Sequence, residues 1–138
     1  MKIETKCLKE GYHPKNGEPK ALPIYQSPTY VYDSAEQIGN LFDLREAGHM
    51  YSRISNPTVD AVEQKIAALE GGVGALCTTS GQAAVLLAVL NLCSAGDHVV
   101  AVSTIYGGSI NLLGVTLKRM GMTCTWVDPT AAPEELDK

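Results

Sequence analysis

The second half of the chain alternates between short apolar segments and segments with helical spacing. The apolar segments are five to six residues long and carry apolar side chains toward both faces; they are 73–78, 98–102 and 122–127. Strands of this kind are typical of a parallel sheet covered by helices, because neither face then meets water. From residue 57 onward the sequence therefore predicts an α/β fold, with the first part of a mostly parallel sheet flanked by helices.

Local signals set the ends of the predicted helices. Asn56 is a favourable N-cap residue, Pro57 suits the first helical position, and glycines at 71 and 72 end the helix. Two further helices are predicted over 81–93 and 108–120. The first is apolar nearly all round, so we expect it to be buried. The turns 79–81 and 103–106 follow strands, and ligands of such sheets bind at the carboxyl ends of strands, so we expect both turns on one rim.

The first part of the chain has a different character. Prolines and tyrosines dominate, and little periodicity is visible before residue 33. We predict an extended arm over residues 1–33, then a short helix that Ser34 caps and that runs to about Glu46. The predicted organisation is an N-terminal arm and inter-subunit segment over 1–56, followed by the beginning of a larger domain over 57–138. Because three strands make a thin sheet, we expect the chain to be the N-terminal portion of a longer protein.

Composition excludes several classes of function. The net charge is -4 and the pI is about 5.3, so no basic surface is expected to bind nucleic acid. The longest apolar stretch, 83–93, is too short to cross a bilayer, and residues 1–6 lack the apolar core of a signal peptide, so we expect no membrane partner and a cytoplasmic protein. The four cysteines form no CxxC pair and the three histidines suggest no metal site, so we expect reduced structural thiols.

Two short segments carry side chains suited to a phosphate group. Tyr51 and Arg53 are two residues apart, so in an extended segment both would project to one face. A guanidinium binds phosphate through two charge-assisted hydrogen bonds, and the phenol adds a third donor. A surface arginine beside a core tyrosine explains the same spacing.

The second segment opens the apolar helix predicted after residue 80. Free amides at the N-terminus of that helix, with the hydroxyl of Ser80 and the small Gly81, suit a phosphate dianion. An ordinary N-cap explains these residues equally well. The chain contains neither of the glycine-rich nucleotide motifs, G-x-x-x-x-G-K-[ST] and G-x-G-x-x-G. Tyr106, followed by two glycines on the same rim, could lie flat on an aromatic cofactor.

In this order and at this spacing, the motifs resemble those of the pyridoxal-phosphate (PLP) enzymes of cysteine and methionine metabolism, the trans-sulfuration group of fold type I. The resemblance covers essentially the whole chain, and the sulfhydrylases that use O-acetylhomoserine are the branch it resembles most, because relatives usually carry methionine in place of Gln82. It is carried by 23–27 (PIYQS), 51–58 (YSRISNPT), 69–72 (LEGG), 80–84 (SGQAA) and 106–108 (YGG).

The resemblance implies PLP as cofactor, an amino-acid substrate and a homo-oligomer with shared active sites. It implies that Ser80, Gly81 and Gln82 bind the cofactor phosphate in their own subunit. It also implies that Tyr51 and Arg53 bind the cofactor phosphate in the neighbouring subunit. Tyr106 would stack on the pyridine ring and take part in proton transfer. The lysine that binds PLP as a Schiff base matches none of the chain's lysines, among them Lys65, Lys118 and Lys138. We therefore expect no complete catalytic set in this chain alone.

Two alternatives stay open at this point. Within the family, a cystathionine γ-synthase or a methionine γ-lyase carries similar motifs. Outside it, a truncated module could bind phosphate or dimerise without catalysing a reaction.

Overall fold

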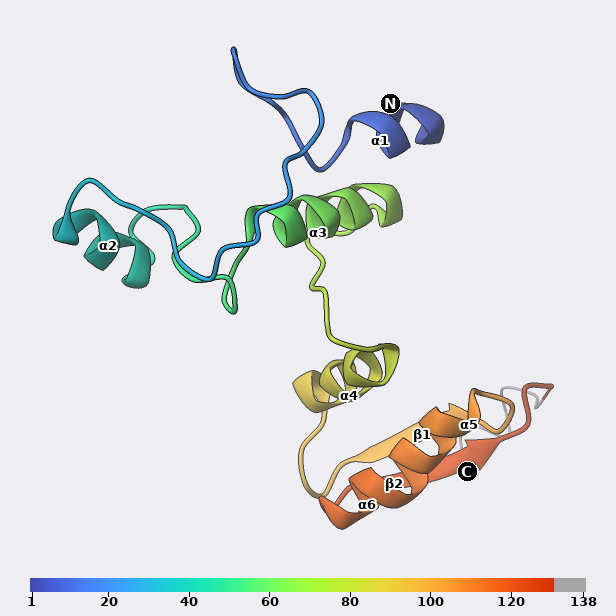
Figure 1. The fold of residues 1–138 in the computed structure, drawn as a ribbon. Coiled ribbons are helices and arrows are strands. Elements are labelled where there is room, and N and C mark those ends of the chain that lie inside the picture. The colour runs from blue at the N-terminus through green and yellow to red at the C-terminus, as the bar shows by residue number, and fades with distance from the viewer. Residues whose placement is uncertain (131–138) are drawn as a thin grey trace. The chain divides into compact units, whose positions relative to one another are not determined.

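The computed structural model describes residues 1–130 and divides into two compact units (Figure 1). The first unit is Met1–Cys77 and the second begins at Thr78. Helix α3, Pro57–Glu70, belongs to the first unit together with the arm. The domain boundary expected at residue 57 stays a prediction.

Helix α3 follows its predicted limits because its caps are local. The side chain of Asn56 accepts a hydrogen bond from the amide of Thr58, and Pro57 occupies the first turn. Gly71 ends the helix in the left-handed conformation, with φ of 70°, which glycine adopts without steric cost.

The arm is not wholly extended, because it begins with helix α1, Ile3–Lys9. Glu4 in the first turn and Lys9 in the last turn match the helix dipole, and this charge pattern is the signal that could have predicted the helix. α1 packs on α3, where the Lys6 ammonium donates to the carbonyl of Ala68 over 2.8 Å. The start of the arm therefore gains order from its contact with α3.

Helix α2 spans Ala35–Phe42 and is shorter than predicted. Ser34 caps it as expected, accepting a hydrogen bond from the amide of Gln37. The helix ends before Glu46 because Leu44 takes a positive φ of 57°, which breaks the α-helical path. Leu41 is buried, whereas Phe42 is 58% exposed.

The second unit contains the parallel sheet. It comprises helix α4 (Gly81–Leu92), strand β1 (His98–Val102), a helical run made of α5 (Gly107–Asn111), the π-helix η1 (Leu112–Thr116) and α6 (Leu117–Arg119), and strand β2 (Thr123–Val127). The strands pair in parallel, with His98 opposite Thr123 and Val102 opposite Val127. This confirms the α/β class and the strands predicted at 98–102 and 122–127.

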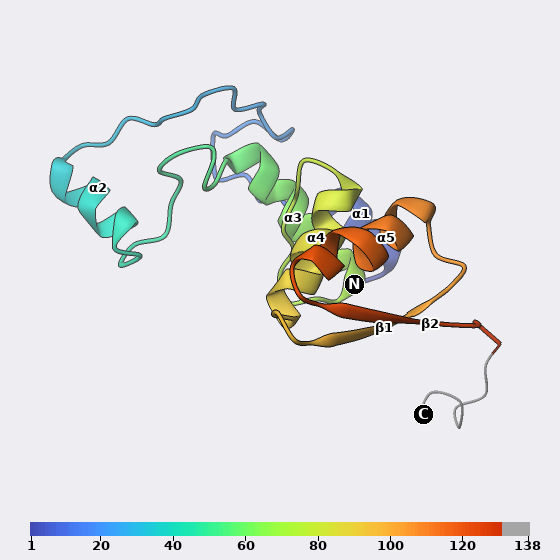
Figure 2. The same cartoon turned by 90° about the horizontal axis from the view of Figure 1, so that it is seen from below.

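The core of the second unit lies between the sheet and its helices. Leu113, Leu117 and Met122 are buried there. Partly buried side chains from α4 and from both strands pack against them, including Leu86, Val89, Val99, Ala101, Cys124 and Trp126. Figure 2 shows the helices of this unit on one side of β1 and β2. The alternate residues of β1, among them Val100 at 54% exposure, face away from this core.

The strand predicted at 73–78 is wrong for the described structure. Residues 74–78 belong to no helix or strand, and Leu76 is 76% exposed. A strand needs a hydrogen-bonded neighbour, and within residues 1–130 β1 and β2 pair only with each other. The amide of Cys77 instead donates to the carboxylate of Glu63 over 2.6 Å.

Helix α4 keeps its predicted limits but is not buried. None of its residues is buried, and Leu87 and Leu90 are 49% and 40% exposed. The helix is apolar on all sides, whereas the described part of the second unit covers one side only. Of the helices within residues 1–130, none combines the length and the apolar character that crossing a membrane requires.

Candidate functional site

The N-terminus of α4 presents a group of hydrogen-bond donors. Ser80 has an extended backbone and caps the helix, since its Oγ accepts from the amide of Ala83 over 3.1 Å and its carbonyl accepts from the amide of Ala84 over 3.0 Å. The amides of Gly81 and Gln82 precede the first of these bonds, so the helix itself gives them no partner. A helix of 12 residues adds the positive end of its dipole at this point.

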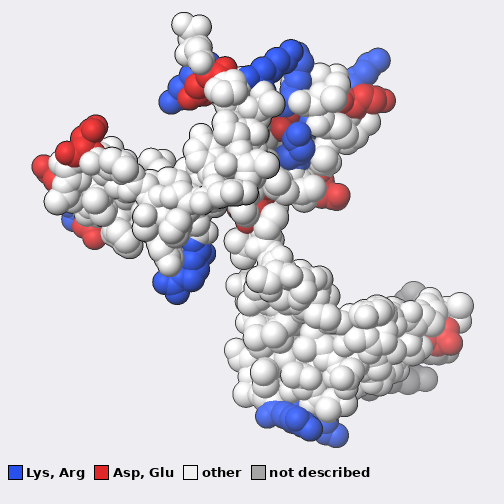
Figure 3. All heavy atoms as spheres, viewed as in Figure 1, with Lys and Arg blue, Asp and Glu red and all other residues white. Residues whose placement is uncertain are grey.

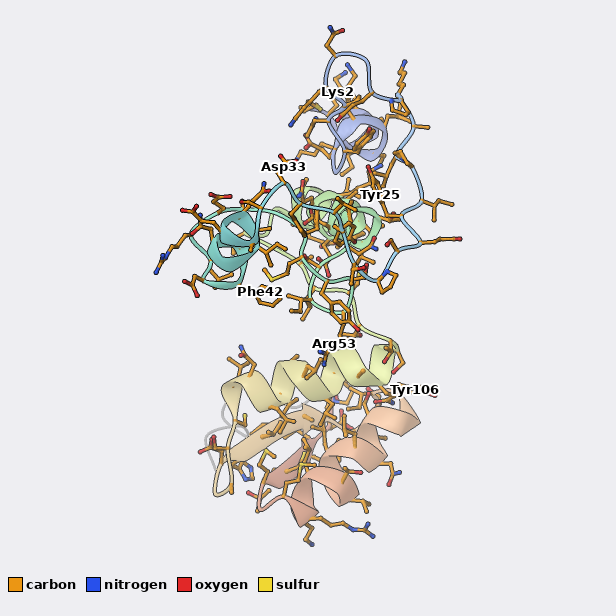
Figure 4. The ribbon with its side chains drawn as sticks, turned by 60° about the vertical axis from the view of Figure 1, so that its left-hand side comes forward. Lys2, Tyr25, Asp33, Phe42, Arg53 and Tyr106 are labelled. Atoms are coloured by element: carbon orange, nitrogen blue, oxygen red, sulfur yellow. The ribbon has the colours of Figure 1, made fainter. Side chains whose placement is uncertain are left out.

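A pocket lies at this helix end. Its lining combines the first turn of α4 with the start of α5, and it consists of Ser80, Gly81, Gln82, Val85, Tyr106 and Ser109. Tyr106 immediately precedes α5 and its side chain is 76% exposed, so the ring is free to meet a ligand (Figure 4). The turns after residue 79 and after residue 102 thus meet at one pocket, as predicted.

Gly108 lies against the side chains of two residues that line this pocket, Gln82 and Tyr106. A Cβ atom at Gly108 would overlap the side-chain amide of Gln82 and the ring of Tyr106. The Oε1 atom of Gln82 is buried and has no hydrogen-bond partner within the described residues. The absence of a side chain at position 108 therefore lets the Gln82 amide and the Tyr106 ring pack closely.

The pocket carries no charged side chain. The second unit has four charged residues up to position 130, and none of them lines the pocket; they are Asp97, Lys118, Arg119 and Asp128. In Figure 3 much of this unit is accordingly white, and its blue atoms gather in one patch. An anion in this pocket would be held by amides and hydroxyls, together with any cation that another part of the protein supplies.

Two groups of the second unit have a shifted pKa, and both lie outside the pocket. Hydrogen bonds from the side chain and the amide of Thr130 hold the pKa of Asp128 below its usual value, with the side-chain bond contributing most. Burial raises the pKa of the Cys124 thiol, which keeps it protonated. Within residues 1–130 no three His, Cys, Asp or Glu side chains converge on a point where a metal could bind.

Tyr51 and Arg53 lie in the first unit, in a turn and not in an extended segment. The carbonyl of Tyr51 accepts from the amides of Ile54 and Ser55 over 2.8 and 2.9 Å, and these bonds fold the segment. The two side chains still meet, because the Arg53 guanidinium lies 5.4 Å from the centre of the Tyr51 ring. Arg53 is exposed, and it has no carboxylate partner within the described residues.

The structure thus brings four of the predicted residues together and places the other two in a different unit. Ser80, Gly81, Gln82 and Tyr106 surround one pocket, whereas Tyr51 and Arg53 form a separate exposed pair. Sequence reasoning missed Ser109, which lines the pocket, and the role of Gly108 behind it. The spacing of Ser109, three residues after Tyr106 and in the first turn of a helix, is the signal that could have found it.

The pocket fits a phosphorylated aromatic cofactor such as PLP. Its free amides and the Ser80 hydroxyl suit the phosphate, and the exposed ring of Tyr106 suits an aromatic ring. The buried, unpartnered Gln82 Oε1 indicates a polar site whose hydrogen bonds are incomplete. No lysine is among the described residues that line the pocket.

Comparison of the sequence with known proteins finds relatives that are enzymes. The chain is 48% identical to O-acetyl-L-homoserine sulfhydrylase 1 of Thermus thermophilus, over 98% of this chain and 32% of the relative. It is 46% identical to the L-methionine gamma-lyase of Fusobacterium nucleatum subsp. polymorphum, over 83% of this chain and 29% of the relative. The chain thus spans about a third of the length of such relatives.

A solved structure matches the fold closely. It is a crystal structure provisionally described as an O-acetylhomoserine (thiol)-lyase from Campylobacter jejuni subsp. jejuni, which contains N'-pyridoxyl-lysine-5'-monophosphate. The TM-score is 0.85 at 38% identity, over 93% of this chain and 30% of the other. The model of the family described as "Cys/Met metabolism PLP-dependent enzyme" matches residues 4–138. The chain therefore belongs to the PLP-dependent enzymes of cysteine and methionine metabolism, and its cofactor is PLP.

Proposed function

We propose that the protein that carries this segment is an O-acetylhomoserine sulfhydrylase. In the proposed reaction, sulfide or a thiol replaces acetate on the γ-carbon of O-acetyl-L-homoserine, and the products are homocysteine or methionine and acetate. The observation that carries the proposal is the pocket formed by 80–82 and Tyr106, in a chain 48% identical to a sulfhydrylase. Gln82 adds support, since relatives in the other branches usually carry methionine there.

The first turn of α4 would hold the cofactor phosphate. The amides of Gly81 and Gln82 and the hydroxyl of Ser80 would supply donors to the anion, and the helix dipole would add attraction. Because the pocket contains no charged side chain, the dianion needs a cation from elsewhere. Arg53, exposed and without a carboxylate partner in the described structure, is suited to this role, with Tyr51 beside it.

Tyr106 would cover the ring of the cofactor. Bound PLP supplies an electron sink for the bonds at the substrate α-carbon. The Tyr106 ring would hold the pyridine in place by stacking, and its hydroxyl would be free to hold or move a proton. Gly108 sets the position of that ring, because any larger side chain would displace it.

The working form would be a homo-oligomer in which Tyr51 and Arg53 of one subunit complete the site of its neighbour. Exposed apolar side chains in the first unit support this, among them Ile24 at 75%, Val31 at 99% and Phe42 at 58%. Burial of such side chains between subunits would stabilise an assembly. The four cysteines are free, which supports a reducing compartment and hence the cytoplasm.

A product assay tests the proposed reaction and separates it from the alternatives. The complete protein, purified with PLP, is given O-acetyl-L-homoserine with and without sulfide. We expect acetate and homocysteine in equal amounts, and only when sulfide is present. A γ-lyase would instead release a 2-oxo acid and ammonia from methionine, and a cystathionine γ-synthase would require cysteine as the thiol. Absence of turnover in all three assays, with PLP bound, would favour a module that binds phosphate without catalysis.

A further inference from the structure

Asn56 makes more hydrogen bonds than a helix cap requires. Its Oδ1 accepts from the amide of Thr58 over 2.9 Å, which is the capping bond. Its Nδ2 donates to the carbonyl of Tyr25 over 3.0 Å and to the hydroxyl of Ser52 over 2.9 Å, and it lies 3.3 Å from the hydroxyl of Tyr30. Asn56 is 8% exposed, so its own side chain is buried, and these bonds are at least partly shielded from water.

Ser52 continues the same network. Its hydroxyl donates to the carbonyl of Ser27 and lies 2.9 Å from the hydroxyl of Tyr30. Since the hydroxyl proton of Ser52 is donated to the carbonyl of Ser27, the phenol of Tyr30 must be the donor in the bond between Tyr30 and Ser52. The Ser52 oxygen thus accepts from Tyr30 and from Asn56, and it has no free position for water.

The network joins a distant part of the arm to the turn and helix start around Asn56. The part of the arm is 25–30, the turn is 51–55, and the helix is α3. Backbone contacts support the junction, since the amide of Ser52 donates to the carbonyl of Pro28 over 2.9 Å and Thr29 forms an antiparallel bridge with Tyr51. Arg53 sits in the middle of this turn, with an exposed side chain.

We propose that Asn56 is a positioning residue for the phosphate-binding arginine. The hydrogen bonds that its Nδ2 atom donates hold the 51–55 turn against the arm. The position of this turn then fixes the direction in which the side chains of Arg53 and Tyr51 leave the backbone. Fixing these side chains before the anion arrives lowers the entropy lost on binding. The proposal deepens the proposed function and rests on the phosphate role of Arg53.

The competing explanation is that Asn56 serves only as the cap of α3. The two roles use different atoms, the Oδ1 acceptor for the cap and the Nδ2 donor for the turn. Asn56→Ser separates them, because serine caps a helix as well as asparagine and carries no amide donor. Asn40→Ser is a matched control, since Asn40 lies in α2 and its side chain bonds only the exposed carboxylate of Glu46 among the described residues.

The experiment uses the complete protein and two measurements. Amide hydrogen exchange of the peptide that covers 51–56 reports the stability of the turn without reference to phosphate. We expect Asn56→Ser to speed this exchange about fivefold to tenfold, the effect of one lost internal hydrogen bond, with no change from Asn40→Ser. Unchanged exchange in Asn56→Ser would overturn the positioning role.

The second measurement is the dissociation constant of PLP from the cofactor-free protein, in Arg53 and Arg53→Ala backgrounds. We expect Asn56→Ser to weaken binding about fivefold with Arg53 present and by less than about twofold without it. An equal loss in both backgrounds would show a general structural effect and overturn the proposal. If Arg53→Ala alone leaves PLP affinity unchanged while the exchange still rises, the phosphate role of Arg53 fails and the Asn56 turn contact stands.

Discussion

At the scale of single residues, the absence of a side chain at Gly108 determines how closely the residues of the pocket pack. The Gln82 amide and the Tyr106 ring both occupy the space that a Cβ atom would need. Both neighbours are the movable ends of side chains, so the protein can yield without unfolding. A substitution here is therefore expected to change binding and to leave stability nearly intact.

We predict that Gly108→Ala weakens PLP affinity about tenfold and changes the free energy of unfolding of the cofactor-free protein by less than about 1 kcal/mol. Titration of PLP into the cofactor-free protein and urea denaturation measure the two quantities. Gly107→Ala is the control, because nothing lies within 4 Å of the Cβ position there. Equal affinities for the two variants would refute the packing role of Gly108.

The residues of the pocket could be predicted because they depend on local structure. A small turn and an apolar helix capped by Ser80 are readable in order, although the strand predicted before them at 73–78 is wrong, and the structure contains both the capping bond and the meeting of the two turns at one pocket. The contacts of Asn56 could not be predicted. They join it to Tyr25 and Tyr30, more than 20 residues away, and no local pattern encodes such a pairing.

At the scale of helices and strands, two helices in this chain share one kind of N-cap. Ser34 on α2 and Ser80 on α4 both have an extended backbone, and each hydroxyl accepts from the amide three residues later over 3.1 Å. The proposed function gives an anion to α4 alone. The pair therefore allows the capping role and the phosphate role to be separated.

We predict that Ser80→Asp abolishes detectable PLP binding while the melting temperature of the cofactor-free protein stays within about 2 °C. Aspartate caps a helix as well as serine does, but its charge repels a phosphate group by about 4 kcal/mol for each unit of phosphate charge at contact distance near a protein surface. Ser34→Asp should leave both quantities unchanged. Retention of PLP by Ser80→Asp in spectroscopic titration would contradict the phosphate role of α4.

Sequence patterns predicted the elements whose ends or partners lie within the described residues, namely two capped helices and the two paired strands. α3 and α4 begin and end within one residue of prediction, because caps and glycines act within a turn. The segment 73–78 has the composition of a buried strand but no partner among the described residues, and pairing decides whether a strand exists. α1 was missed because its signal lies in charges and not in apolar spacing.

At the scale of the whole molecule, the candidate site is divided. The pocket belongs to the unit that begins at Thr78, whereas Arg53 and Tyr51 belong to the unit Met1–Cys77. The apolar sides of α4 and of the arm remain exposed within residues 1–130. These surfaces are consistent with a chain that spans about a third of its relatives' length.

The central claim is that Arg53 of one subunit completes the phosphate site of another. Mixing two inactive variants of the complete protein tests it, one with Arg53→Ala and one without the lysine that carries PLP. In a mixed dimer one site would hold both defects and the other neither, so equimolar exchange should restore about a quarter of the wild-type activity at limiting PLP. No recovery, with subunit exchange verified by mass spectrometry, would place Arg53 in its own subunit's site and contradict the account.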